Sequence, residues 1–168
     1  MDTYTDHAEA AAIVSASSER VFARLDEQAL LGSHMGKPSM MMMGGSMSYD
    51  LDAAQGRAVG SVIAMRGHFM GLRLLAREVV TEREPPRRKV WETRGPQRLL
   101  VIAAYRMGFE IQPRDQEAYL RVFIDYRRPQ GLLGRMPVAL VGGIYARWCV
   151  ARMVADARRH FASNQGAT

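Results

Sequence analysis

Glu78 is the residue with the clearest capacity for chemistry. It lies in Leu72–Glu82, and if this alternating stretch is a strand, Glu78 shares a face with Val80. Buried alone, its carboxylate would cost several kcal/mol, so it would be partnered, protonated, or used as a general acid or base. The simpler interpretation, which we favour, is that a twist or bulge lets Glu78 reach solvent. If it is buried, its partner is expected to be an arginine: Arg66, Arg73 or Arg106.

Aromatic and methionine side chains are the other candidates for a binding site. Tyr105 lies on the apolar face of an alternating stretch, and it joins Glu78 as a weak candidate for acid–base catalysis. The chain has 12 methionines, which suit an adaptable interior, although methionine also fills gaps in ordinary cores. Each tyrosine could equally be a core residue with a satisfied hydroxyl. The predicted ligand-binding set is Met65, Glu78, Trp91, Tyr105, Met107, Tyr126 and Tyr145.

Other kinds of reactive site are not indicated by the sequence. The four histidines show no metal-ligand spacing with one another or with Cys149, so neither a metal nor another cofactor is expected. Cys149 stands between Trp148 and Val150 in an apolar stretch, which favours a buried structural thiol over a nucleophile. The chain also lacks the serine elbow and the glycine-rich phosphate loop that mark hydrolases and nucleotide-binding proteins.

Composition favours one domain without a nucleic-acid partner. The chain has 168 residues, 48% of them hydrophobic, which is enough for a sizeable core. Its formal charge is +6, but the arginines are spread along the chain, which disfavours nucleic-acid binding and leaves peripheral contact with an anionic membrane open. We expect a single domain over residues 1–168, with a core over about 7–162. The sequence does not indicate an oligomeric state.

The sequence favours a cytoplasmic location. The single cysteine, Cys149, excludes an internal disulfide and suits a reducing compartment. Residues 1–12 lack the positive region of a secretion signal. Arg147 and Arg152 interrupt the best candidate for a membrane span. We therefore expect a soluble, cytoplasmic protein.

The order of patterns predicts an α+β fold. A strand is expected over Ala8–Ala16, followed by a helix that begins after an N-cap at Ser17. A second short helix is expected over Gln28–Leu31. Turn residues then separate six stretches with the two-residue period of strands. These are Met47–Leu51, Gly56–Phe69 with Val59 on its apolar face, Leu72–Glu82, Lys89–Thr93, Leu99–Ile111 and Ala118–Tyr126.

The remaining segments are a hairpin and a long C-terminal helix. The charges of Arg83–Lys89 are interpreted as a solvated hairpin tip around Pro85 and Pro86. The last helix is expected over Gly134–Phe161, and from Met136 to Val154 it is apolar on nearly every side. Such a helix is normally buried, so the sheet is expected to wrap it or another surface to cover it. A hollow between sheet and helix would be a place for a ligand.

Four segments resemble the START/Bet v 1-like superfamily, also called SRPBCC and often labelled polyketide cyclase or dehydrase. They are Ile13–Phe22, Val59–Ser61, Val80–Trp91 and Leu140–Phe161. The resemblance implies a helix-grip fold, in which a curved antiparallel sheet of about seven strands (β-α-α-β6-α) wraps a long C-terminal helix. It also implies an internal cavity. The superfamily holds carriers, cyclases and aromatases without a universal catalytic set, so fold analogy cannot choose among activities.

Three functions therefore stay open. The first is the binding or carrying of an apolar or amphipathic small molecule, such as a lipid, isoprenoid or polyketide-like compound. The second is a cyclase, aromatase or dehydratase, with Glu78 or a tyrosine as general acid or base and an arginine holding an enolate or carboxylate. The third is a module that docks on a membrane or a partner protein through the start of the last helix.

Overall fold

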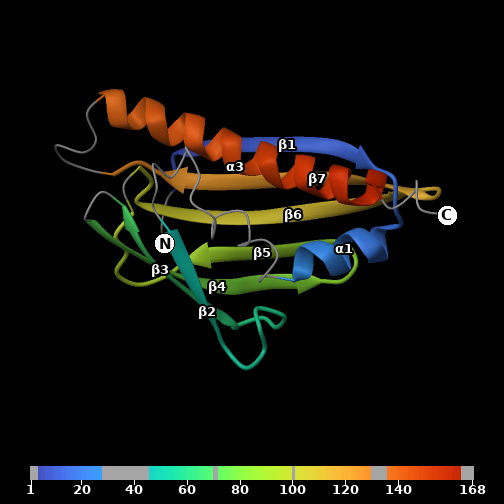
Figure 1. Ribbon diagram of the computed structural model, residues 1–168, viewed down its shortest axis with the longest axis horizontal. Coiled ribbons are helices and arrows are strands. Elements are labelled where there is room, and N and C mark those ends of the chain that lie inside the picture. The colour runs from blue at the N-terminus through green and yellow to red at the C-terminus, as the bar shows by residue number, and fades with distance from the viewer. Residues whose placement is uncertain (1–3, 28–45, 70–71, 100, 130–135, 164–168) are drawn as a thin grey trace.

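An antiparallel sheet forms the centre of the molecule. The computed structural model describes residues 4–27, 46–69, 72–99, 101–129 and 136–163. Within these residues seven strands lie in the order β1-β7-β6-β5-β4-β3-β2 (Figure 1). The elements are β1 (Asp6–Val14), α1 (Ser18–Asp26), β2 (Ser46–Leu51), β3 (Val62–Phe69), β4 (Leu72–Glu84), β5 (Arg88–Thr93), β6 (Ala104–Arg114), β7 (Glu117–Arg127) and α3 (Met136–Ser163).

The N-terminal strand and helix follow the predicted patterns closely. β1 begins two residues earlier than expected, and its alanines alternate with exposed polar residues such as His7 and Glu9. Ser17 is the N-cap of α1, and Val21, Phe22 and Leu25 are buried as their helical spacing predicts. Their apolar face packs on β6 and β7. The short helix expected over Gln28–Leu31 lies outside the described residues.

The segment before β3 is a turn and not part of the strand. β3 was expected to begin at Gly56, but it begins at Val62, and Val59 is 63% exposed. The carboxylate of Asp52 explains the late start, because its Oδ2 accepts from the Val62 amide at 2.8 Å and its Oδ1 accepts from the Ser61 hydroxyl at 2.6 Å. These hydrogen bonds pair the polar groups of the turn with a side chain nearby, as side-chain-to-backbone bonds in turns commonly do.

The last two strands form the longest hairpin of the sheet. In β7 the five predicted inward residues are all buried, and Tyr126 at the end of the strand is 4% exposed. β6 begins at Ala104, five residues later than predicted, because Leu99 and Val101 pack against the core from the segment before the strand. Leu75 in β4 forms an isolated bridge with Arg98 in this segment.

The helix α3 packs on β1 and β7 along one side only. Its buried residues recur at helical spacing: Ala146, Val150, Met153, Val154, Ala157 and Phe161. Val141 and Ile144 are 49% and 55% exposed, so the sheet covers α3 on one side, and the expected alternative, that another surface covers the rest, stays a prediction. Figure 1 shows α3 lying along β1 and β7 while β2 and β3 run obliquely to them, which is the curvature that a twisted sheet produces.

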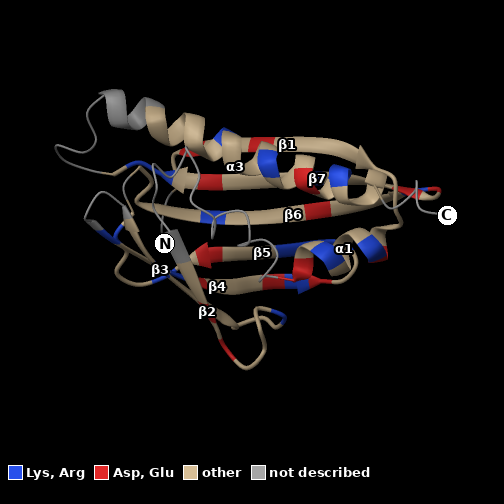
Figure 2. Ribbon diagram, in the orientation of Figure 1, with Lys and Arg blue, Asp and Glu red and all other residues tan. Residues whose placement is uncertain are grey.

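Charged residues are mixed over the described elements. Figure 2 shows acidic and basic residues interspersed on the strands and on the second half of α3. This mixture matches the spread of arginines along the sequence. In the described part of the chain, no helix combines the length and hydrophobicity that a bilayer crossing requires.

Candidate functional site

Glu78 lies on the inner face of β4, toward the helices. Its neighbours on this face, Ala76 and Val80, are fully buried, and Glu78 itself is 4% exposed. The strand does have a bulge, but it comes later, between Val80 and Glu82. The two-residue period therefore holds at Glu78. The interpretation that Glu78 reaches solvent is wrong.

A tyrosine, and not an arginine, is the partner of Glu78. The Tyr105 hydroxyl donates a hydrogen bond to Oε1 of Glu78. Thr93 lies opposite Glu78 in the β4–β5 register. Its hydroxyl donates to the Tyr105 carbonyl at 3.1 Å and accepts from the Tyr105 amide at 3.0 Å. Thr93 therefore fixes the backbone of Tyr105 in the same cross-strand row as Glu78.

The three arginines that were expected as partners have other environments. Arg106 donates to Glu82 at 2.8 Å, on the outer face of the sheet. Arg66 lies 3.6 Å from Asp50, and both side chains are largely exposed. Arg73 is exposed as well. Strand parity explains the result, because Arg106 follows Tyr105 directly and therefore points to the opposite face.

The surroundings of Glu78 raise its pKa to a value near neutral pH. Burial raises the pKa of Glu78 to about 7, although hydrogen bonds from Tyr105 and Trp91 and the positive charge of Lys89 oppose the rise. Near neutral pH the group is therefore present in both forms. A carboxyl group in this state can give or take a proton, and it can pair with a ligand group of opposite charge.

Tyr49 brings a further hydroxyl toward this cluster. Tyr49 lies in β2, opposite Met65 of β3. Its hydroxyl is buried and has no hydrogen-bond partner among the described residues. Burial, with the nearby charges of Glu78 and Cys149, raises the pKa of Tyr49. A buried hydroxyl is normally paired, so this one has a hydrogen bond to offer to a bound molecule.

The helix α3 contributes Tyr145 and Cys149 to the same region. The two side chains stand one turn apart and are hydrogen-bonded to each other. Burial raises the pKa of the Cys149 thiol to about 12, which keeps it protonated and supports a structural role. Burial, with the charges of Cys149, Tyr49 and Glu78, also raises the pKa of Tyr145. The Glu78 cluster, as we name it, therefore comprises Tyr49, Glu78, Trp91, Tyr105, Tyr145 and Cys149.

The other predicted site residues surround this cluster. Met65 and Met107 are both at least 92% buried in the core on the inner face. Tyr126 is directly opposite Tyr105 in the β6–β7 register, and its hydroxyl faces Gly143 of α3. Tyr49 and Thr93 were not predicted as site residues. Each shares a strand face with a residue of an apolar or predicted inward position, Tyr49 with Leu51 and Thr93 with Trp91, which could have indicated them. The sequence alone, however, does not place their strands side by side.

A second buried charge cluster holds the β4–β5 hairpin against α1. The Lys89 ammonium is fully buried, and its Nζ lies 2.8 Å from Oδ1 of Asp26. Arg83 donates to the same carboxylate at 2.7 Å. The expectation of a solvated tip over Arg83–Lys89 is therefore wrong for these two residues. Asp26, at the end of α1, compensates both charges and allows Lys89 to point inward.

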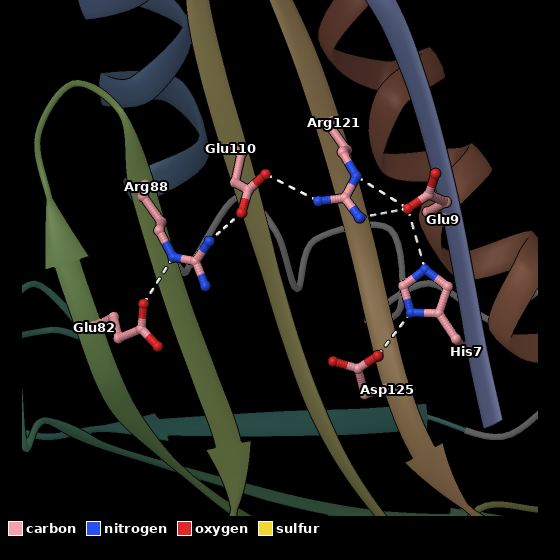
Figure 3. Close-up of polar contacts among 7 residues, drawn as sticks. All are labelled: His7, Glu9, Glu82, Arg88, Glu110, Arg121 and Asp125. Carbon is pink, nitrogen blue, oxygen red and sulfur yellow. Dashed lines mark hydrogen bonds and ion pairs between the residues drawn. The ribbon is translucent and has the colours of Figure 1, made fainter. Parts of the chain in front are cut away.

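The outer face of the sheet has an ion-pair network of its own. Figure 3 shows the chain of contacts running across β4, β5, β6, β7 and β1. Arg88 bridges Glu82 and Glu110, and Arg121 bridges Glu110 and Glu9. His7 then contacts Glu9 at 3.1 Å and Asp125 at 2.6 Å. These side chains are 26–49% exposed and neutralise one another, so the network is a solvated surface feature.

No metal site is evident in the parts of the chain that the structure describes. Groups of three or more histidine, cysteine, aspartate or glutamate side chains close enough to hold an ion are absent there. The polar groups of the Glu78 cluster are one carboxyl group, phenols, an indole and a thiol. This set suits hydrogen bonding to an organic molecule better than metal binding.

Comparisons with known proteins give the fold. No family model matches the chain, and no curated protein matches it in sequence. Among solved structures, TTHA0849 from Thermus thermophilus has a TM-score of 0.67 at 12% identity, covering 95% of this chain and 99% of that one. A point mutant of norcoclaurine synthase from a Thalictrum species, with a transition-state analogue, has a TM-score of 0.63 at 10% identity, covering 98% and 99%. For Ara h 8.0201 the TM-score is 0.54 at 8% identity, covering 89% and 98%.

Proposed function

From the Bet v 1-like helix-grip fold of this chain, we propose that it binds or carries an apolar or amphipathic small molecule between the sheet and α3. The single observation that carries the proposal is the Glu78 cluster. It places one carboxyl group and several phenols among buried apolar side chains, which is the composition of a small-molecule site. The site residues proposed are Met65, Glu78, Trp91, Tyr105, Met107, Tyr126 and Tyr145, with Tyr49 added.

Binding would be driven by burial of the apolar part of the ligand. Apolar surface contributes roughly 25 cal/mol for each Å² removed from water, before the cost of ordering the ligand. The polar groups would orient the ligand. Glu78 and the Tyr49 hydroxyl, which has no hydrogen-bond partner among the described residues, lie among side chains that offer few other hydrogen bonds. Lipids, isoprenoids and polyketide-like compounds combine these two requirements.

Native mass spectrometry of the freshly purified protein tests the proposal directly. We expect a mass in excess of the polypeptide that is lost on organic extraction and identified as an apolar molecule. The stripped protein should take the same molecule up again, with a change in Trp91 fluorescence. Spectra that show only the bare polypeptide, together with no uptake from a panel of lipids and aromatic compounds, would count decisively against it.

An enzyme of cyclase, aromatase or dehydratase type is the second candidate. The observation that favours it is the direct hydrogen bond between Tyr105 and a carboxyl group whose pKa lies near 7. Glu78 would act as the general acid or base. The Tyr105 hydroxyl would hydrogen-bond to its carboxyl group or would itself serve as the proton donor or acceptor. The arginine that was expected to hold an enolate or carboxylate has no counterpart in the described part of the Glu78 cluster, so phenol hydroxyls would take that role.

Turnover of a captured ligand separates the two candidates. If the protein is an enzyme, Glu78→Gln should reduce kcat by about two orders of magnitude or more, which is the contribution that acid–base catalysis usually makes. Tyr105→Phe should reduce it less and should move the pH profile. A ligand that is bound tightly and released unchanged by the wild-type protein supports a carrier.

A further inference from the structure

When it is ionised, Glu78 brings to its cluster a negative charge for which the described residues supply no dedicated cation. Tyr105 donates a neutral hydrogen bond to the carboxyl group. The indole of Trp91, the other hydrogen-bonding neighbour, can only donate. Both neighbours therefore treat Glu78 as an acceptor. This is the arrangement expected around a carboxylate and not around a carboxylic acid that donates its own proton.

Among the described residues, the buried cation near Glu78 is Lys89, and it pairs with another carboxylate. Lys89 lies on the same strand as Trp91, but its Nζ is 2.8 Å from Oδ1 of Asp26 and 3.2 Å from the Asp26 carbonyl oxygen. Asp26 and Lys89 are both buried, so this pairing is a strong one. The charge of Lys89 acts on Glu78 only at longer range, and the burial of Glu78 outweighs it.

The remaining groups of the cluster suit a positively charged organic group. Trp91, Tyr105, Tyr49 and Tyr145 present aromatic rings, whose faces attract cations. The buried hydroxyl of Tyr49 lacks a partner among the described residues, and a hydroxyl oxygen can accept a hydrogen bond from an ammonium group. An anionic ligand group would instead meet Glu78 as a like charge.

We infer that the ligand carries a protonated amine, or a similar organic cation, and that this group pairs with the carboxylate of Glu78 beneath the rings of Trp91 and the tyrosines. The inference rests on the proposed function, because it names the chemical class of ligand for the same site. The apolar remainder of the ligand would lie against Met65 and Met107. The raised pKa of Glu78 supports the inference, since an approaching cation would favour ionisation of a group that is half protonated when the site is empty.

Three probes with one carbon skeleton test the charge preference. Octylamine, octanol and octanoate are titrated into the purified full-length protein by isothermal titration calorimetry at about pH 7.5. We expect octylamine to bind about tenfold or more tightly than octanol, since a hydrogen bond between two charged groups is stronger than one from a neutral hydroxyl, and octanoate to bind most weakly. At about pH 5.5 the preference for octylamine should shrink, because Glu78 then retains its proton.

Two variants assign the preference to Glu78. Glu78→Gln keeps the shape of the side chain and should abolish the preference for octylamine over octanol. Glu92→Gln is the matched control, because Glu92 lies on the adjacent strand, points to the outer face and pairs with Arg94. This control should retain the wild-type preference. Thermal unfolding of each variant reports whether it is folded.

The outcomes distinguish this inference from the proposed function. Octanol or octanoate binding as tightly as octylamine would overturn the inference and leave the proposed function standing. An octylamine preference that survives in Glu78→Gln, or that does not change between pH 5.5 and 7.5, would also overturn it. If none of the three probes binds, and the panel of lipids fails as well, both proposals fall together.

Discussion

At the scale of single residues, Glu78 is buried at a cost in folding stability, and it is also the residue with the clearest chemical use. A carboxyl group that is 4% exposed destabilises the protein whenever it is ionised, unless something compensates it. The hydrogen bond from Tyr105 compensates only in part, since the pKa still lies near 7. Carboxyl groups with a pKa raised in this way are concentrated at functional sites, which supports the role proposed for Glu78.

Glu78→Gln should therefore remove a pH dependence of stability. In the unfolded chain Glu78 loses its proton near its ordinary pKa of 4.5, whereas in the folded protein it keeps the proton up to about pH 7. The contribution of Glu78 to the free energy of unfolding is therefore fully present below pH 4.5 and is lost as the pH rises through 7. The loss corresponds to about 3 kcal/mol, at about 1.4 kcal/mol for each pH unit. Urea denaturation at pH 4.5 and pH 8 should show this loss in the wild type and not in Glu78→Gln.

Glu92→Gln serves as the control for this measurement as well. Glu92 is part of an outer-face pair with Arg94, so its substitution should leave the wild-type pH dependence in place. Equal pH dependence in the wild type and in Glu78→Gln would contradict the assignment of a raised pKa to Glu78.

At the scale of elements, the contacts of α3 and α1 with the sheet decide where the site can form. Gly142 allows α3 to approach the segment before β6, because a Cβ there would lie 2.6 Å from the Val101 carbonyl oxygen. At the other end, Asp26 joins the end of α1 to the β4–β5 hairpin through Lys89 and Arg83. These two contacts hold the helices at a fixed distance from the inner face.

The two adjacent glycines of α3 should respond in opposite ways to alanine. Gly142→Ala should destabilise the protein by about 1–3 kcal/mol, because the new methyl group meets a backbone carbonyl that cannot move independently. Gly143→Ala should be neutral or stabilising by up to about 1 kcal/mol, since a Cβ there meets only the Tyr126 hydroxyl, at 3.4 Å, and alanine favours a helix. Thermal unfolding of both variants measures the difference. Equal effects would show that α3 does not approach Val101 in this way.

The Asp26–Lys89 pair should behave as a buried ion pair. Asp26→Asn should cost about 3–5 kcal/mol, because it leaves the buried ammonium of Lys89 without a counter-charge. Replacing the lysine as well, in Asp26→Asn with Lys89→Met, should recover most of the loss. Chemical denaturation of the two variants and the wild type measures this coupling. As a control, Asp156→Asn removes an exposed helical pair with Arg152 and should cost about 0.5 kcal/mol or less. Additive effects of the two buried substitutions would contradict the pairing.

At the scale of the whole molecule, the exposed part of α3 is a surface where, among the residues that the structure describes, apolar side chains gather on a helix. Val141 and Ile144 are about half exposed, and the chain carries a net charge of +6. Contact with an anionic membrane surface, which the sequence leaves open, would place these side chains at the interface and the arginines near the lipid headgroups. A carrier of apolar molecules would gain from such contact when it loads or releases its ligand.

Flotation with lipid vesicles tests this contact. The protein should float with vesicles rich in phosphatidylserine, remain in solution with vesicles of phosphatidylcholine alone, and dissociate when the salt concentration is raised to about 0.5 M. A double variant, Val141→Asp with Ile144→Asp, should reduce the floating fraction by about tenfold, through lost apolar burial and added negative charge. Flotation that is unaffected by this double variant would assign the contact to another surface.

Much of the fold was accessible to prediction because local patterns dictate it. The alternation of β7, the capped start of α1 and the long apolar C-terminal helix are confirmed, and together they are typical of the helix-grip fold that the solved structures share. The start of β3 was missed, because the carboxylate of Asp52 holds a turn that strand periodicity does not encode. The start of β6 was predicted too early, since Leu99 and Val101 are half-buried without being in a strand.

Sequence by itself determined that Glu78 shares a strand face with Val80 and that Tyr105 lies on the apolar face of its strand, because a strand alternates its side chains whatever its neighbours are. It did not determine that Glu78 is buried, and the favoured interpretation was that Glu78 reaches solvent. Only the tertiary structure decided that Glu78 and Tyr105 meet, that Thr93 aligns them, and that Asp26 takes the charge of Lys89 away from Glu78. These facts depend on strand register and helix packing, which join residues far apart in the chain through contacts that no local pattern contains.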